Sequence, residues 1–207
     1  MNLKLLGLLA AALLTSAGPA CAQDSPEAII KRAVEEVTVV LKSDADIKAG
    51  NRQKINALVD SKILPYLSVE RMTQAAAGRH WTNATPEQKL ALTREFKILL
   101  TNTYAGAFTN YRADTVIEYL AARATSGDTE SVVRSVIKTG ASGTIQLDYY
   151  LEKIDGTWKV TDFNVIGVRI VEAYKSQFNA AASADGMDGI IKALAAKNRA
   201  IESRGKA

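Results

Sequence analysis

The chain has 207 residues, with 26 Lys and Arg, 22 Asp and Glu, one His and one Cys, for a formal net charge of +4. One histidine and one cysteine exclude zinc sites built from several histidines or from paired cysteines. The basic residues are scattered and do not form the clustered stripe, interleaved with aromatic residues, that nucleic-acid-binding surfaces carry.

The first 22 residues have the features of a secretory signal peptide. Lys4 is followed by an apolar run over residues 5–14, too short to span a bilayer, and by the small-residue site Ala20-Cys21-Ala22. Cleavage after Ala22 would leave 207 minus 22, or 185 residues, which fits one domain over 23–207 without a cysteine. The alternative is lipid attachment at Cys21, although Gly18-Pro19-Ala20 lacks the leucine that usually precedes such a site.

Residues 25–111 predict a helical half. Ser25-Pro26 can start a helix over 26–41, because serine caps a helix and proline fits its first position. Residues 43–51 read as a loop, a second helical period runs over 55–64, and a short helix over 67–77 ends at Gly78. A long helix begins at Thr85-Pro86, with Gln88 placed to complete a capping box, and continues to about Tyr111.

Residues 114–201 predict a sheet followed by returning helices. Strand patterns run over 116–120, 131–137, 144–151 and 157–165, and short turns between them favour an antiparallel meander. In the third strand Ile145, Leu147, Tyr149 and Leu151 alternate with mostly polar residues, so we expect helices to cover one face of the sheet. The fold class is therefore α+β.

The stretch 156–178 joins a strand to a helix. Its pattern changes near Gly167 to a helical period in which Val168, Val171, Tyr174 and Phe178 share one face. After Phe178 an Ala/Ser/Asp/Gly passage reads as a linker up to Gly186, and a final helix follows over 187–201. The helix that follows this strand can cover an apolar space beside the sheet, and that space is filled either by protein or by a ligand.

The sequence contains few side chains in patterns typical of catalytic sites. His80 is the one histidine available to a Ser–His–Asp triad, and no Gly-x-Ser-x-Gly turn accompanies it. Glu118, Asp148 and Asp162 fall in predicted strands, where each could act as a general base in a cavity or point to solvent. We expect no enzymatic activity and no cofactor, and the apolar faces favour binding.

Several separated motifs together resemble one family. They are Leu64-Pro65-Tyr66 with Val69-Glu70-Arg71-Met72, Gly78-Arg79-His80-Trp81 with Ala84-Thr85-Pro86-Glu87-Gln88, Phe96-Lys97-Ile98-Leu99-Leu100 with Thr103-Tyr104-Ala105, and Trp158-Lys159-Val160, Asp162, Gly167-Val168 and Tyr174-Lys175-Ser176-Gln177-Phe178. In this order and spacing they resemble the MlaC/toluene-tolerance family of periplasmic phospholipid carriers, over essentially the whole chain after the signal peptide. The chain departs from the family's pattern at Ile166, Arg169 and Ala173, where that pattern has an acidic residue, a serine and an asparagine.

The resemblance implies a twisted antiparallel sheet of NTF2-like character, wrapped by helices around an apolar cavity that holds the acyl chains of a phospholipid. It also implies a monomeric carrier in a Gram-negative periplasm, exchanging lipid between an outer-membrane lipoprotein–porin complex and an inner-membrane ABC-transporter complex with its substrate-binding subunit. The alternatives are an NTF2-like enzyme with a cavity carboxylate and a ligand-free module that binds a partner protein. We expect the lipid-binding residues to be Leu100, Tyr104, Phe108, Val133, Leu147, Tyr149, Val165, Val168, Val171 and Tyr174.

Overall fold

The computed structural model describes residues 25–120, 129–140 and 143–204, and the predicted signal peptide with Cys21 lies outside them. The elements in chain order are α1 (Pro26–Ser43), α2 (Ala45–Lys48), α3 (Arg52–Leu58), the π-helix η1 (Val59–Ile63), the 3-10 helix η2 (Leu64–Tyr66), α4 (Val69–Ala77), α5 (Arg79–Thr82), α6 (Pro86–Tyr104), α7 (Gly106–Thr109), β1 (Val116–Leu120), β2 (Glu130–Lys138), β3 (Thr144–Ile154), β4 (Thr157–Val165), β5 (Val168–Arg169) and α8 (Ile170–Arg204). None of the helices in these ranges combines the length and the apolar character needed to cross a membrane.

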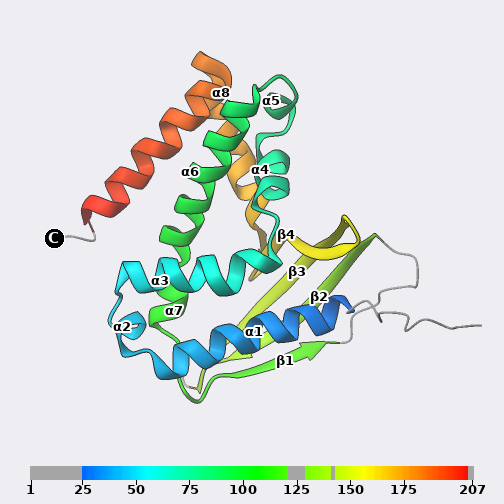
Figure 1. Ribbon diagram of the computed structural model, residues 1–207, viewed down its shortest axis with the longest axis vertical. Coiled ribbons are helices and arrows are strands. Elements are labelled where there is room, and N and C mark those ends of the chain that lie inside the picture. The colour runs from blue at the N-terminus through cyan, green and yellow to red at the C-terminus, as the bar shows by residue number, and fades with distance from the viewer. Residues whose placement is uncertain (1–24, 121–128, 141–142, 205–207) are drawn as a thin grey trace, which may run out of the picture.

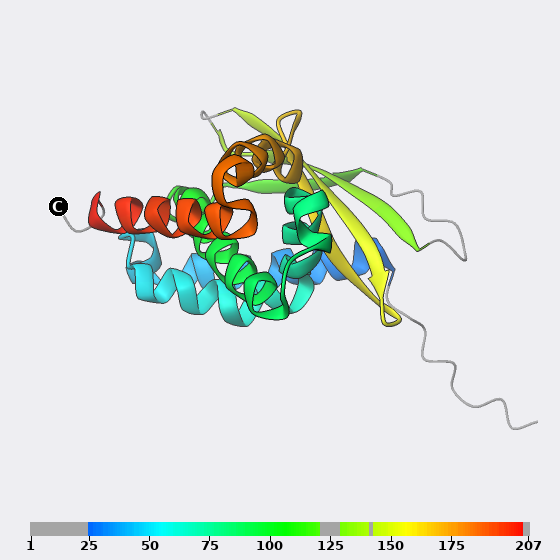
Figure 2. The same cartoon turned by 90° about the horizontal axis from the view of Figure 1, so that it is seen from above.

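The strands form one sheet in the order β1-β2-β3-β4-β5, and each neighbouring pair is antiparallel. Figures 1 and 2 show the strands as a twisted layer with the helices gathered on one side. The predicted α+β class with a twisted antiparallel sheet is confirmed. Tyr149 and Leu151 of β3 are buried as the alternation predicts, and Val133 of β2 lies directly opposite Tyr149.

The start of α6 follows the sequence prediction closely. The Thr85 hydroxyl accepts a hydrogen bond from the Gln88 N–H at 3.2 Å, and the Gln88 side chain accepts one from the Thr85 N–H at 3.0 Å. Pro86 takes the first helical position, where its missing N–H costs nothing. The helix ends at Tyr104 and a separate short helix, α7, follows, so the prediction of one helix continuing to Tyr111 is wrong.

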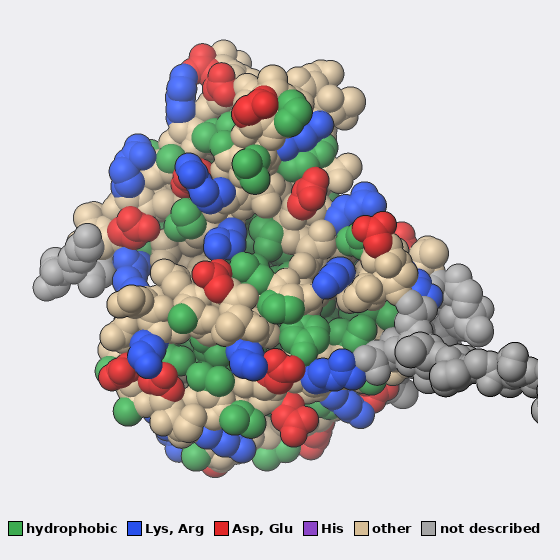
Figure 3. All heavy atoms as spheres, viewed as in Figure 1, with side chains coloured by type: hydrophobic (Ala, Val, Ile, Leu, Met, Phe, Trp, Pro, Cys, Tyr) green, Lys and Arg blue, Asp and Glu red, His purple; other side chains and the backbone are tan. Residues whose placement is uncertain are grey.

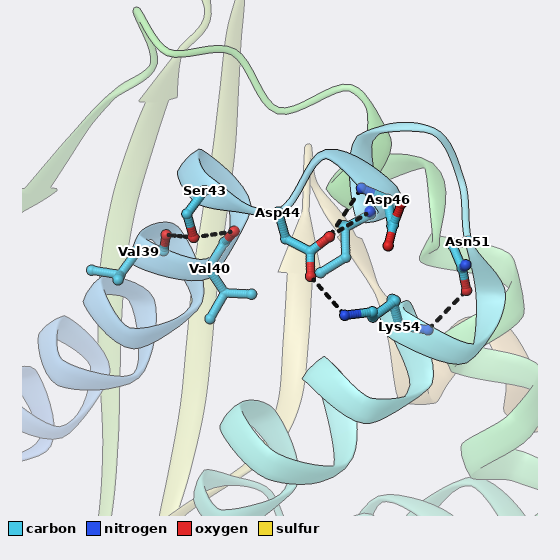
Figure 4. A network of polar contacts seen from close by, with 8 residues as sticks. Val39, Val40, Ser43, Asp44, Asp46, Asn51 and Lys54 are labelled. Carbon is cyan, nitrogen blue, oxygen red and sulfur yellow. Dashed lines mark hydrogen bonds and ion pairs between the residues drawn. The ribbon is translucent and has the colours of Figure 1, made fainter.

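The segment predicted as a loop over 43–51 contains helix α2. Figure 4 shows the reason: an Asp44 oxygen accepts hydrogen bonds from the N–H groups of Asp46 at 2.9 Å and Ile47 at 3.2 Å, which caps the new helix. The other Asp44 oxygen lies 3.6 Å from the Lys54 ammonium of α3, and Asn51 caps α3 through the Lys54 N–H. These polar contacts fix the turn that brings α3 back beside α1.

The C-terminal segment differs most from the prediction. Residues 179–186, expected to be a linker, belong to α8, which departs from helical geometry only at Asp185 and Gly186. Alanine has the highest helix propensity, and the run from Ala180 to Ala182 favours helix over linker. The kink lets the two halves of α8 meet at an angle, as Figure 1 shows in orange and red.

Candidate functional site

Buried apolar side chains form three separate clusters, which we name the helical, sheet and corner clusters. The helical cluster consists of Met72, Ala76, Ala77, Trp81, Ala84, Leu92, Phe96, Leu99, Ile170, Val171, Tyr174, Phe178, Ala182, Met187, Ile190 and Leu194. The sheet cluster consists of Ile29, Ile30, Val133, Tyr149, Leu151, Trp158 and Val160. The corner cluster consists of Leu41, Ile47, Ile55 and Leu58.

Helices α6 and α8 meet through aromatic rings. Phe96 makes edge-to-face contacts with Tyr174, at 5.1 Å between ring centroids, and with Phe178, at 5.3 Å. Phe96 and Phe178 are fully buried, and burying each apolar side chain of this size stabilises the fold by about 1.5–3 kcal/mol. Val171 and Tyr174, predicted to bind lipid, therefore lie on the face of α8 that packs against α6.

The face of the sheet that is turned toward the helices, its inner face, carries a second group of buried apolar side chains. Val133 and Tyr149 belong to the sheet cluster, and Leu147 packs against it. Burial raises the pKa of Tyr149, although a hydrogen bond with Ser135 opposes the shift. The Tyr149 ring contacts Phe163 of β4 at 5.8 Å between centroids. An apolar surface thus runs from β2 across β3 to β4.

Phe163 and Leu67 pack against both the helical and the sheet clusters, and they make the interior continuous between the two. Sequence reasoning missed both residues as candidates. Phe163 carried a usable signal, since it alternates with Val165 on the same strand. Leu67 carried none: its position depends on a bridge to Val160 of β4, far along the chain.

The remaining predicted residues lie around these clusters. Leu100 and Val165 are half-buried against the helical cluster, and Phe108 packs against the corner cluster. Tyr104 is 38% exposed, and burial of its ring together with the nearby Tyr174 raises its pKa. The predicted residues thus belong to the helical or the sheet cluster or pack against one of the three clusters, except for Tyr104 and Val168. Whether they contact lipid stays a prediction.

Val168 does not lie on helix α8. It belongs to β5, where it pairs with Val165, and it is 54% exposed. The prediction that the helical period begins at Val168 is wrong, because Ile166 and Gly167 adopt positive φ angles of 51° and 83° and form a hairpin turn first. The helix begins at Ile170.

Asp162 determines where α8 begins. This buried carboxylate accepts hydrogen bonds from the N–H of Phe163 at 2.7 Å and the N–H of Val171 at 3.0 Å, and its other oxygen accepts one from Arg169 Nε at 2.6 Å. Of the two alternatives that the sequence left open for Asp162, the solvent-facing one is wrong because the side chain is buried, and its bonds give it a capping role. Glu118 is exposed and pairs with Lys138.

The described residues offer little other chemistry. Within these ranges no group of three or more His, Cys, Asp or Glu side chains could hold a metal ion. His80 shares a hydrogen bond of 3.1 Å with the Asn179 side chain. Figure 3 shows hydrophobic side chains recessed near the centre of one face, between α3 below and α4 above. The hydrophobic side chains recessed there are available to contact an apolar ligand.

Comparisons with known proteins agree with this geometry. A family model described as MlaC protein matches residues 31–196. The toluene tolerance protein ttg2D of Pseudomonas putida is 27% identical over 169 residues, which cover 81% of this chain and 77% of the relative. The intermembrane phospholipid transport system binding protein MlaC of Haemophilus influenzae is 22% identical over 176 residues, which cover 83% and 81%.

A solved structure extends the comparison to the fold. A phospholipid-binding protein from Ralstonia solanacearum, in complex with a phospholipid, is similar with a TM-score of 0.82 and 39% sequence identity. The match covers 86% of this chain and 99% of that one.

Proposed function

This chain belongs to the MlaC family, and on that basis we propose that it binds a phospholipid by its acyl chains and carries it through the periplasm. The observation that carries the proposal is the phospholipid bound in the Ralstonia solanacearum relative, which shares both fold and sequence with this chain. The apolar clusters around α6, α8 and the inner sheet face give the acyl chains a matching environment.

The acyl chains lie between three walls. The first is α6 with α7 (Leu100, Tyr104 and Phe108), the second the inner sheet face (Val133, Leu147, Tyr149 and Val165), and the third the start of α8 (Val171 and Tyr174), with Val168 at the rim. Half-buried side chains such as Leu100 and Leu147 support this placement, because each packs against one cluster and can be covered further by a ligand. Tyr104 and Val168 are the most exposed of the set, which favours the mouth of the site over its depth.

A carrier protein shields the acyl chains of a phospholipid from water. Each buried methylene is worth about 0.8 kcal/mol, so two chains of about 15 carbons would cost roughly 20 kcal/mol or more to expose to water. An apolar interior resembles the bilayer, and transfer into it from a membrane complex can be close to neutral. Differences in affinity, or ATP hydrolysis by a partner, then set the direction.

The exchange partners are an inner-membrane ABC-transporter complex with its substrate-binding subunit and an outer-membrane lipoprotein–porin complex. The name of the Haemophilus influenzae relative supports a place in an intermembrane phospholipid transport system. The signal-peptide pattern supports export, and the carrier acts as a monomer. Amino-terminal sequencing of the exported protein should begin at Gln23 if cleavage follows Ala22.

The decisive experiment is extraction of the exported protein. Organic solvent should release about one phospholipid per chain, identified by mass spectrometry, from protein purified without added lipid. Protein that carries no lipid, and takes up none from phospholipid micelles, would contradict the proposal.

A further inference from the structure

The short turn between β4 and β5 places two aliphatic side chains in water. Ile166 is 66% exposed and Val168 is 54% exposed, and Gly167 lies between them in the chain. We name residues 166–168 the hairpin tip. Removing aliphatic side chains from water is favourable, yet the fold leaves more than half of each of these two uncovered.

The backbone of the hairpin tip makes isoleucine an unexpected residue at its first position. Both turn residues have positive φ, 51° at Ile166 and 83° at Gly167, as in the type I′ turn of two-residue hairpins. Asparagine, aspartate and glycine favour such positions, whereas a β-branched residue is strained there. Neither backbone preference nor packing accounts for Ile166. A residue that breaks local rules without a gain for the fold is expected at a functional site.

The hairpin tip is held firmly at its base. The Ile166 N–H donates a hydrogen bond of 3.0 Å to the backbone carbonyl of Gln146 in β3. Arg169, which follows the tip, is bonded to the buried Asp162 carboxylate at 2.6 Å, and its guanidinium lies 3.7 Å from the centroid of the Tyr150 ring. The exposed side chains therefore belong to a fixed frame, and contact with another surface orders little additional backbone.

The hairpin tip continues the apolar surface of the proposed lipid site. Val168 lies directly opposite Val165, so the two side chains are on the same face of the sheet. Val165 is half-buried and packs against the helical cluster. On the next strand Leu147 lies opposite Val165 and packs against the sheet cluster. A row of aliphatic side chains therefore runs from the two clusters to Val168 at the surface.

In the segments that flank the hairpin tip, charged side chains come in pairs of opposite sign. They are Arg169 with Asp162 at 2.6 Å, Lys175 with Glu172 at 3.5 Å, and Arg134 directly opposite Asp148 on the neighbouring strand. These pairs cancel one another's charge at a distance, so they neither attract nor repel an anionic surface strongly. Apolar contact is therefore the main interaction that the tip offers.

Size and shape narrow the class of occupant. A standard interface between two copies of the chain takes about 800 Å² from each, and two aliphatic side chains supply only a small part of it. A protein partner would need a pocket matched to the shape of the projecting turn. A lipid surface needs no such match, because the boundary between head groups and acyl chains accommodates apolar side chains of any shape. These observations favour a lipid surface.

We propose that the hairpin tip enters the interface of a lipid bilayer, where Ile166 and Val168 contact the upper parts of the acyl chains. This contact rests on the proposed carrier function, because it brings Val165 and the walls behind it next to the phospholipid that is exchanged. Two aliphatic side chains give a weak contact, which lets the carrier leave the membrane again.

Co-sedimentation of the mature chain with sucrose-loaded phosphatidylcholine vesicles, up to millimolar lipid, tests this contact. The unmodified chain should bind, and about 1 M sodium chloride, which shortens the Debye length to about 3 Å, should not weaken the binding. Ile166→Asn should bind at least about fivefold more weakly, because it removes an exposed aliphatic side chain. Ile166→Leu keeps an apolar side chain and should bind as the unmodified chain does.

The matched control removes an aliphatic side chain elsewhere on the surface. Leu90 of α6 is 74% exposed, and Leu90→Asn should leave vesicle binding unchanged. Ile166→Asn should remain folded, because asparagine tolerates the positive φ of this position. Circular dichroism of both variants checks the fold, so that a loss of binding in Ile166→Asn reports the contact itself.

A dye at the hairpin tip shows whether this segment makes the contact. The chain that begins at Gln23 contains no cysteine, so Ile166→Cys and Leu90→Cys each provide one attachment site for an environment-sensitive fluorophore. With vesicles, the emission of the dye at position 166 should shift to shorter wavelength, and that of the dye at position 90 should not.

The proposal would be overturned if the unmodified chain did not bind vesicles, if Ile166→Asn bound as well as the unmodified chain, or if high salt abolished the binding. A dimer detected by light scattering that Ile166→Asn dissociates would assign the tip to a second copy and overturn it too. Phospholipid that copurifies with the same samples should be equal in Ile166→Asn and the unmodified chain. Failure of the membrane contact is thereby distinguished from failure of lipid binding.

Discussion

The Asp162 carboxylate accepts a hydrogen bond of 3.0 Å from the backbone N–H of Val171, nine residues further along the chain. This bond ties β4 to the first turn of α8 and so positions the helix face that carries Tyr174 and Phe178 against α6. The negative carboxylate also favours the positive end of the helix dipole. One side chain thus sets the angle between two walls of the proposed lipid site.

Removal of this cap should weaken the whole fold. Hydrogen bonds to a charged group are worth about 1.5–3 kcal/mol each, and Asp162→Ala removes three, so we expect the free energy of unfolding to fall by at least about 3 kcal/mol. Urea denaturation measures it. Asp60→Ala, which removes an exposed ion pair with Lys97, is the matched control and should cost less than about 1 kcal/mol. Equal losses in both variants would contradict the capping role.

Ile166 should be a strained position. A β-branched residue at a φ of 51° is unfavourable, and its side chain is 66% exposed, so little packing offsets the strain. Ile166→Asn should raise the free energy of unfolding by about 0.5–1 kcal/mol, because asparagine tolerates this conformation. The neighbouring Gly167→Ala should lower it by about 1–2 kcal/mol through backbone strain alone, since a Cβ there meets no atom within 4 Å. Urea denaturation measures both variants, and a lower free energy of unfolding in Ile166→Asn would show that Ile166 is not strained.

The two halves of α8 should be sensitive to one added methyl group. A Cβ at Gly189 would collide with the backbone carbonyl of Ala181, and backbone atoms cannot move aside as a side chain can. We expect Gly189→Ala to lower the free energy of unfolding by about 1–3 kcal/mol. Gly106→Ala in α7 is the control, because a Cβ there makes only an ordinary contact with Asn110 at 3.8 Å. Calorimetric melting of both variants would show whether the close approach matters.

The ionisation of Tyr119 should make stability depend on high pH. Burial raises its pKa to about 12, and the negative charges of Glu27 and Glu35 add to the shift. The folded state therefore keeps the proton after the unfolded chain has lost it, at a pKa of about 10. This contribution to stability is present below pH 10 and is lost as the pH rises from about 10 to about 12. Over that interval Tyr119→Phe should lose less stability than the unmodified chain, and identical pH profiles would contradict the shift.

Phospholipid content should respond to substitution at the border of the clusters. Leu100→Trp adds bulk to a half-buried position of α6, and we expect it to reduce the phospholipid that copurifies with the protein by at least about half, because well-packed interiors tolerate little added volume. Leu90→Trp on the same helix is the control, since Leu90 is 74% exposed. Circular dichroism should show both variants folded. If the phospholipid content of Leu100→Trp equals that of the unmodified chain, α6 does not form a wall of the proposed lipid site.

Local signals predicted much of the fold. The capping box of Thr85 and Gln88 and the alternation of Leu147, Tyr149 and Leu151 involve residues within a few positions of one another, and such patterns are readable in one dimension. Asp155 and Gly156, with positive φ at both residues, form the turn between β3 and β4, one of the short turns that the strand pattern predicts. In each case the residues that interact are also neighbours in sequence.

Long-range contacts account for what the sequence did not reveal. The capping of α8 by Asp162, the bridging positions of Leu67 and Phe163, and the stacking of Arg169 on Tyr150 join residues from separate elements. No local period encodes them, because they exist only once the sheet twists and the helices pack.

The sequence by itself thus determined the α+β class, a helical first half followed by four antiparallel strands, and a set of apolar faces, since periodicity and turn chemistry are local. Only the tertiary structure decided where α8 begins, how the apolar residues divide into three clusters, and which charged residues meet on the outer face of the sheet. The physical reason is that burial and charge pairing depend on which faces meet in space.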